Sequence, residues 1–87
     1  MKLSEEKYMT TFEIVAKAVA ARTSSDVASL TPETDVREDL GMDSLDAVEL
    51  IMELEDEFGI TIPSENSADL KTIAEIVALI DGIKENA

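Results

Sequence analysis

Residues 41–59 read GMDSLDAVELIMELEDEFG, and this stretch decides the fold. Positions 45–58 hold no glycine or proline, and Gly59 follows where helices commonly stop. Asp43 is a favourable N-cap residue, and Asp46, three positions later, completes a pair that resembles a capping box. The stretch therefore predicts an acidic helix that begins just after Asp43.

Ser44 lies in the first turn of this expected helix. Backbone N–H groups without an intrahelical partner and the helix dipole both favour a phosphate at that position. The setting therefore suits a serine that is joined to a phosphodiester. A serine that only helps to cap the helix is the alternative interpretation.

Two apolar faces run along the same helix. At about 100° per residue, one face spans roughly 240–340° from Ser44 and is a normal core face; it contains Ala47, Leu50, Ile51, Leu54 and Phe58. The other lies at roughly 40–100° and consists of Leu45, Val48 and Met52. One helix of a small bundle needs a single core stripe, so the second strip predicts a docking patch. Packing of this strip against a long loop is the alternative.

Acidic residues dominate the charge of the chain. It has 20 Asp and Glu against 7 Lys and Arg, a formal net charge of −13. No basic residue occurs between Arg37 and Lys71, so ordinary salt-bridge pairing along the central helix is not expected. This surface would repel nucleic acid and anionic membranes, and we expect neither as a partner. Proteins with basic patches are the expected partners.

The composition also limits the chemistry. The 87 residues include no histidine and no cysteine, so a Ser-His-Asp site or an ordinary zinc site cannot form. We therefore expect neither catalytic nor metal-ligating residues, and we do not expect the chain to be an enzyme. No apolar run approaches the roughly 18 residues of a membrane span. We expect one domain over residues 1–87, a monomer, and a cytoplasmic location.

Apolar spacing predicts four helices and no strand. A first helix is indicated by a stripe at four-, three- and four-residue spacing, and Thr10 with Glu13 forms a candidate capping box; the stripe is Tyr8, Phe12, Val15 and Val19. Residues 1–9 are an extension or a frayed start of this helix.

A long connection separates the first helix from the central one. It spans residues 22–43, is rich in turn residues, and has three apolar residues that could hold it to the core; these are Leu30, Val36 and Leu40. A second break at residues 59–63 precedes a short third helix around residues 67–70. Thr72 then caps a last helix, whose apolar side contains Ile73, Ile76, Val77, Ile80 and Ile83.

The motif Asp-Leu-Gly-x-Asp-Ser-Leu at residues 39–45 opens an acidic helix, which closes with Phe-Gly-Ile-x-Ile-Pro at residues 58–63. With this pattern the chain resembles the acyl carrier proteins of fatty acid synthesis. The resemblance implies a small four-helix bundle with three longer helices and one short third helix. It also implies that Ser44, flanked by Asp43 and Leu45, is joined to 4′-phosphopantetheine by a phosphopantetheinyl transferase that uses coenzyme A. The thiol of that group would hold growing acyl chains as thioesters.

The resemblance also implies two further sites. An acyl chain would be buried between the second and third helices, lined by Leu50, Leu54, Ile62, Leu70 and Ile73. Basic patches on acyl-transfer and fatty acid synthesis enzymes would dock on Asp43, Asp46, Val48, Glu49, Met52, Glu55 and Asp56. Such charge-guided docking gives fast association and release.

Two alternatives remain at this point. A discrete aminoacyl, peptidyl or polyketide carrier would share the serine and the bundle. From another class, the chain could be an unmodified acidic interaction domain or a calcium-binding regulatory domain. The segment that starts at Asp35 resembles an EF-hand loop only loosely, because Arg37 takes a ligand position and Gly41 comes one residue late.

Overall fold

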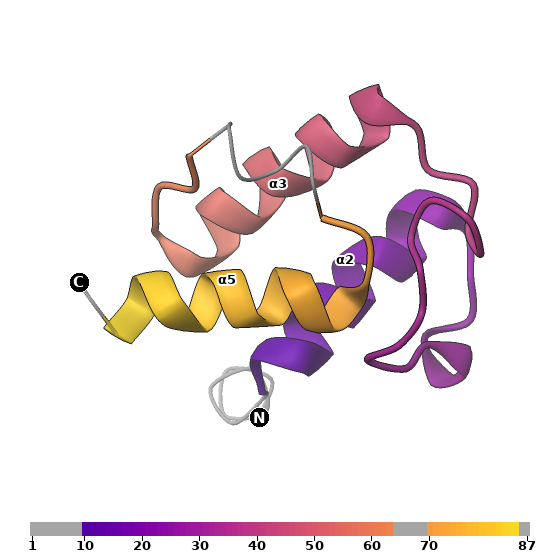
Figure 1. Ribbon diagram of the computed structural model, residues 1–87, viewed down its shortest axis with the longest axis horizontal. Helices are drawn as coiled ribbons and strands as arrows, with labels where there is room; N and C mark the ends of the chain where they lie inside the picture. Colours follow the sequence, from indigo (N-terminus) through magenta and orange to yellow (C-terminus); the bar gives the residue numbers. More distant parts are fainter. Residues whose placement is uncertain (1–9, 64–69, 86–87) are drawn as a thin grey trace, which may run out of the picture.

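The computed structural model describes residues 10–63 and 70–85. These residues form three α-helices and one short 3₁₀ turn; they are α2 (Thr11–Thr23), η1 (Val27–Ser29), α3 (Ser44–Phe58) and α5 (Ile73–Glu85). Helix α2 packs against both α3 and α5. Figure 1 shows α3 above α5, with α2 crossing α5 and the long connection looping out beyond one end of the helices.

Helix α2 begins with the predicted capping box. The Thr10 hydroxyl accepts a hydrogen bond from the Glu13 amide at 3.1 Å, and the Glu13 carboxylate accepts one from the Thr10 amide at 2.8 Å. These two bonds satisfy amides that the first helical turn leaves without partners, which fixes the start of the helix. The helix ends at Thr23, and the C-cap residue Ser24 lies in the left-handed region with φ 57°. The possible earlier start, and Tyr8 of the predicted stripe, lie outside the described residues.

Helix α3 begins and ends as the sequence predicts. Asp43 is its N-cap and forms a reciprocal capping box with Asp46, while Gly59 terminates the helix with φ 65°. A left-handed residue at this position is inexpensive only for glycine. The local sequence therefore fixes both ends of the helix that contains Ser44.

Helix α5 receives a cap from its own sequence and from the long connection. The predicted cap residue Thr72 accepts a hydrogen bond from the Glu75 amide at 3.2 Å, and Glu75 accepts from the amides of Lys71 and Thr72 at 2.7 and 3.1 Å. The next amides of the first turn donate to the carbonyls of Pro32 and Thr34 at 2.9 and 3.1 Å. The long connection therefore supplies part of the cap of the last helix.

These bonds make Glu75 responsive to acid. Hydrogen bonds from the backbone amides of Lys71 and Thr72 lower the pKa of Glu75 below its ordinary value of 4.5. Because the folded pKa is depressed, the stabilisation is complete above the unfolded pKa and is lost as the pH falls through the folded pKa. We expect the difference in Tm between the wild type and Glu75→Gln to stay constant above about pH 5.5 and to shrink below about pH 4.5. Thermal unfolding followed by circular dichroism over pH 3–7 tests this, and a difference independent of pH would contradict it.

The long connection, residues 24–43, folds back against the helices. The Val36 amide donates to the Lys71 carbonyl at 2.8 Å, and an isolated antiparallel bridge pairs Asp35 with Thr72. Two of its three predicted apolar anchors, Leu30 and Val36, are buried, and Leu40 is half-buried against the core. The connection is thus held in place by backbone pairing and by burial together.

A single apolar core lies where the helices meet. Its most buried side chains come from all three helices and include Val15, Val19, Leu54, Ile73 and Ile80, each with no exposed surface. At the edge of the core, the Thr11 hydroxyl donates to the Asp81 carboxylate at 2.8 Å and joins α2 to α5. The apolar stripes expected for the first and last helices therefore face the core, with Phe12, Val77 and Ile83 packed at its margin.

The predicted count of four helices is not confirmed. Residues 64–69, which include most of the expected short helix, lie outside the described residues, and Leu70 is not helical. The backbone at Lys71 pairs with Val36 of the long connection, which gives this part of the chain a partner other than a helical turn. None of the helices in residues 10–63 and 70–85 is long and apolar enough to cross a membrane.

Candidate functional site

Ser44 is the first residue of α3 and is exposed to solvent. The preceding residue, Asp43, accepts a hydrogen bond from the Asp46 amide at 2.8 Å. Among the described residues, the amides of Ser44 and Leu45 have no hydrogen-bond partner. The start of α3 therefore presents a reachable hydroxyl beside two free N–H groups at the positive end of the helix dipole, an arrangement that suits a phosphodiester.

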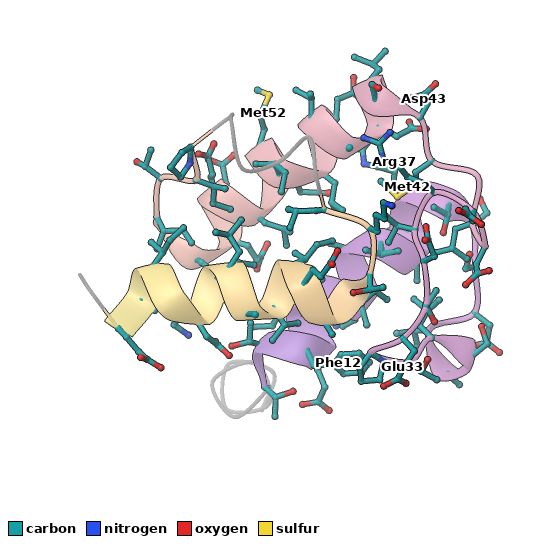
Figure 2. The ribbon with its side chains drawn as sticks, in the orientation of Figure 1. Phe12, Glu33, Arg37, Met42, Asp43 and Met52 are labelled. Atoms are coloured by element: carbon teal, nitrogen blue, oxygen red, sulfur yellow. The ribbon has the colours of Figure 1, made fainter. Side chains whose placement is uncertain are left out.

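The segment before Ser44 is fixed by its backbone and by one buried side chain. Gly41 has φ 75°, a region that favours glycine, and its amide donates to the Arg37 carbonyl at 3.0 Å. Met42 is buried and its amide donates to the Val36 carbonyl at 3.0 Å. Figure 2 shows Arg37, Met42 and Asp43 near the start of α3. This turn fixes the chain on the N-terminal side of the serine.

The second apolar strip of α3, defined here as the outer strip, consists of Leu45, Val48 and Met52. Their exposed fractions are 65%, 49% and 59%, so the strip faces solvent and does not pack against the long connection. Met52 projects away from the other helices in Figure 2. The exposure expected from the helical spacing is thereby confirmed, and a docking role for the strip stays a prediction.

The acids predicted to surround the outer strip differ in how exposed they are and in whether they already have a partner within the protein. Asp43, Asp56 and Glu49 are exposed, and Asp46 is half-buried in the capping box. Glu49 is also paired: its Oε1 lies 2.7 Å from Nη1 of Arg22 on α2. This pair does not run along the central helix, where no basic residue is available; helix packing instead brings in a cation from 27 positions earlier.

Glu55 has a structural partner. Its Oε2 accepts a hydrogen bond from the Ile62 amide at 2.6 Å, and the Ile62 side chain is buried. The carboxylate thus holds the segment after Gly59 against α3. Of the predicted docking acids, Asp43 and Asp46 accept backbone amides within their own capping box, whereas Glu55 accepts the amide of a residue seven positions later.

We expect Glu55→Ala to destabilise the domain by about 1–3 kcal/mol, because it leaves the part-buried Ile62 amide without an acceptor. Glu55→Gln keeps an acceptor oxygen and should retain most of the stability. Urea unfolding followed by circular dichroism measures both variants. Glu57→Ala, at an exposed position of the same helix, is the matched control for loss of an acid. Equal losses for Glu55→Ala and Glu57→Ala would contradict this assignment.

A small cavity lies between α3, the long connection and α5. Its free volume is about 10 Å³, about the space of a single water. The lining residues are Val36, Met42, Ala47, Leu50, Ile51, Leu70 and Ile76. An acyl chain would fit only if the cavity widened.

Sequence reasoning found part of this lining. Leu50 and Leu70 line the cavity, while Leu54, Ile62 and Ile73 are buried in the core and are not among its lining residues. The other lining residues were not predicted; they are Val36, Met42, Ala47, Ile51 and Ile76. For Met42 and Ala47 the sequence does contain a local signal. An apolar residue before the N-cap commonly packs on the fourth helical residue, and Met42 and Ala47 occupy these positions.

The acids of the long connection do not form a metal site. No group of three or more His, Cys, Asp or Glu residues that could hold an ion occurs in residues 10–63 and 70–85. Asp35 instead accepts hydrogen bonds from the amides of Arg37 and Glu38 at 2.9 and 2.8 Å, and Asp39 accepts from the Asp35 amide at 2.9 Å. These carboxylates stabilise the turn of the connection itself.

Comparison with known proteins identifies the family. Residues 13–80 match the family model described as the phosphopantetheine attachment site. Acyl carrier proteins of Helicobacter hepaticus and Helicobacter pylori are 45% and 41% identical to the chain over 76 residues, which cover 87% of it and 100% and 97% of these relatives. The chain belongs to the acyl carrier protein family. A solved acyl carrier protein structure from Enterococcus faecalis superposes with a TM-score of 0.74 at 29% identity, covering 86% of this chain and 99% of that one.

Membership of the acyl carrier protein family gives the site its chemistry. The family model and the relatives' name together indicate that these proteins carry acyl groups on a covalently attached phosphopantetheine. The described residues fit an attached phosphopantetheine. The exposed hydroxyl of Ser44 lies beside the free amides at the start of α3, and Met42, two residues earlier, lines the cavity. The protein itself has no cysteine, so any reactive sulfur would be supplied by the attached group.

Proposed function

We propose that Ser44 is the attachment residue and that the protein carries growing acyl chains between the enzymes of fatty acid biosynthesis. The observation that supports this most directly is the exposed Ser44 hydroxyl at the capped start of α3, beside the outer strip. Asp43 caps the helix on which the Ser44 hydroxyl lies. Leu45, the residue after Ser44, is the first residue of the outer strip. The chain's own residues position the carrier group and recognise partners, while other enzymes perform the chemistry.

The cavity supports a second part of the proposal, the shielding of the acyl chain. Met42 lies two residues before Ser44 and lines the cavity together with Leu50 and Leu70. An acyl chain that enters there would gain about 0.8 kcal/mol per buried CH₂. That gain has to offset the cost of separating the side chains that line the cavity, whose free volume is only about 10 Å³. Longer chains should therefore be held better than short ones.

The third part concerns the partners. A phosphopantetheinyl transferase and the acyl-transfer enzymes would contact the outer strip with apolar residues and the exposed acids Asp43 and Asp56 with basic ones. Such interfaces combine a small apolar centre with a polar rim. Charge attraction at the rim mainly raises the association rate, which suits a carrier that visits many enzymes.

Phosphopantetheine transfer is the experiment that tests the proposal. The protein is incubated with coenzyme A and a broad-specificity phosphopantetheinyl transferase, and its intact mass is recorded. We expect a gain of one phosphopantetheine group, and acylation of the new thiol by fatty acid synthesis enzymes. A folded protein that gains no mass would contradict attachment. A modified protein that accepts only amino acids would instead favour an aminoacyl or peptidyl carrier.

A further inference from the structure

Arg22 extends from the last turn of α2 to the acidic face of α3. Its Nη1 lies 2.7 Å from Oε1 of Glu49, and the two side chains are 24% and 48% exposed. The sequence has no basic residue in positions 38–70, so this charge reaches the acid-rich helix from elsewhere in the fold. Arg22 places a positive charge beside an exposed acid of α3.

Glu49 borders the outer strip. It lies four residues after Leu45 and three before Met52, and residues at these spacings are neighbours on a helix surface. A partner that covers the outer strip must therefore pass close to Glu49 and its guanidinium partner. The ion pair stands at the edge of the proposed docking patch.

Releasing Glu49 to another cation would be unfavourable. Arg22 is three-quarters covered, and its Nε is buried without a hydrogen-bond partner among the described residues. If a partner's lysine or arginine took Glu49, the Arg22 guanidinium would lose its carboxylate in a partly desolvated position. It would also lie near the incoming cation, and like charges repel.

We propose that Arg22 is a specificity-determining residue, which occupies Glu49 and directs basic partners to two other exposed acids, the N-cap residue Asp43 and Asp56. This inference rests on the proposed carrier function. Its partner is the basic docking surface of the phosphopantetheinyl transferase. Arg22 then reduces the attraction of Glu49 at the edge of the outer strip and leaves Asp43 and Asp56, towards the two ends of α3, as the main contacts.

A double-mutant cycle tests this inference. The kcat/KM of phosphopantetheine transfer is measured at low ionic strength for the wild type, Arg22→Gln, Glu49→Gln and the double variant. Arg22→Gln frees Glu49, so we expect kcat/KM to rise roughly 3- to 10-fold. The rise should be absent when Arg22→Gln is made in the Glu49→Gln background, and it should disappear at about 1 M salt, where charges are screened within about 3 Å.

Lys17→Gln is the matched control, because it removes the same charge from an exposed position of α2. We expect it to change kcat/KM by less than about 1.5-fold, since screening limits distant exposed charges. Circular dichroism verifies folding, and Arg22→Met, whose apolar stem fills similar space, replaces Arg22→Gln if that variant is unfolded.

Four results would overturn the inference while leaving the proposed function intact: no rise for Arg22→Gln, a decrease, an equal rise in the Glu49→Gln background, or an equal rise for Lys17→Gln. A wild-type protein that gains no mass at all would overturn the proposed function and this inference with it.

Discussion

Ser44→Ala should abolish phosphopantetheine transfer completely. The substitution removes the only atom through which the proposed phosphodiester can form at this position, and alanine offers no replacement nucleophile. Because Ser44 is exposed and lies after the N-cap, the fold should be retained. Intact mass after incubation with coenzyme A and the transferase should show the wild type fully shifted and the variant unshifted.

Ser29→Ala is the control for this result. Ser29 is an exposed serine at the end of η1, and its hydroxyl donates to the Asp26 carbonyl at 2.7 Å. We expect this variant to gain the same mass as the wild type. A Ser44→Ala protein that is still modified would show that attachment occurs at another hydroxyl, and digestion followed by fragment masses would locate it.

Leu54→Ala should produce the largest loss of stability. The Leu54 side chain has no exposed surface and lies in the core shared by the helices. Truncation of a fully buried leucine costs about 2–5 kcal/mol, through lost burial and the cavity left behind. For a domain of this size that loss should lower Tm by more than about 10 °C, measured by circular dichroism or calorimetry.

Leu45→Ala makes the same chemical change on the same helix. Because Leu45 is 65% exposed, its truncation should alter the free energy of unfolding by less than about 0.5 kcal/mol. It should instead slow transfer by partner enzymes, if the outer strip docks them. Equal destabilisation by the two variants would mean that the outer strip packs against the protein after all.

The features predictable from sequence are those that depend on neighbours along the chain. The capping boxes of Asp43 with Asp46 and Thr72 with Glu75 join residues three apart, so the residue types suffice to predict them. The outer strip follows from the helical period alone. The candidate attachment residue, Ser44, is likewise predictable, because it directly follows the N-cap of one helix.

The features that were missed depend on how separate segments meet. Arg22 and Glu49 are 27 positions apart, and only the packing of α2 on α3 brings them together. The Glu55 bond to the Ile62 amide requires the chain to turn back after Gly59. Periodicity identifies core residues such as Leu54 and Ile73, but it does not indicate where their packing leaves a gap.

The hydrogen bonds from the first turn of α5 to the carbonyls of Pro32 and Thr34 bear on the order of folding. They connect residues about forty positions apart, so the last helix completes its start only after the long connection is in place. Helices shorter than about 12–15 residues are marginal in isolation, and α5 has 13 residues. A peptide of residues 70–85 should therefore be largely unstructured in water. On a ribosome, this closing step would wait until α5 had emerged.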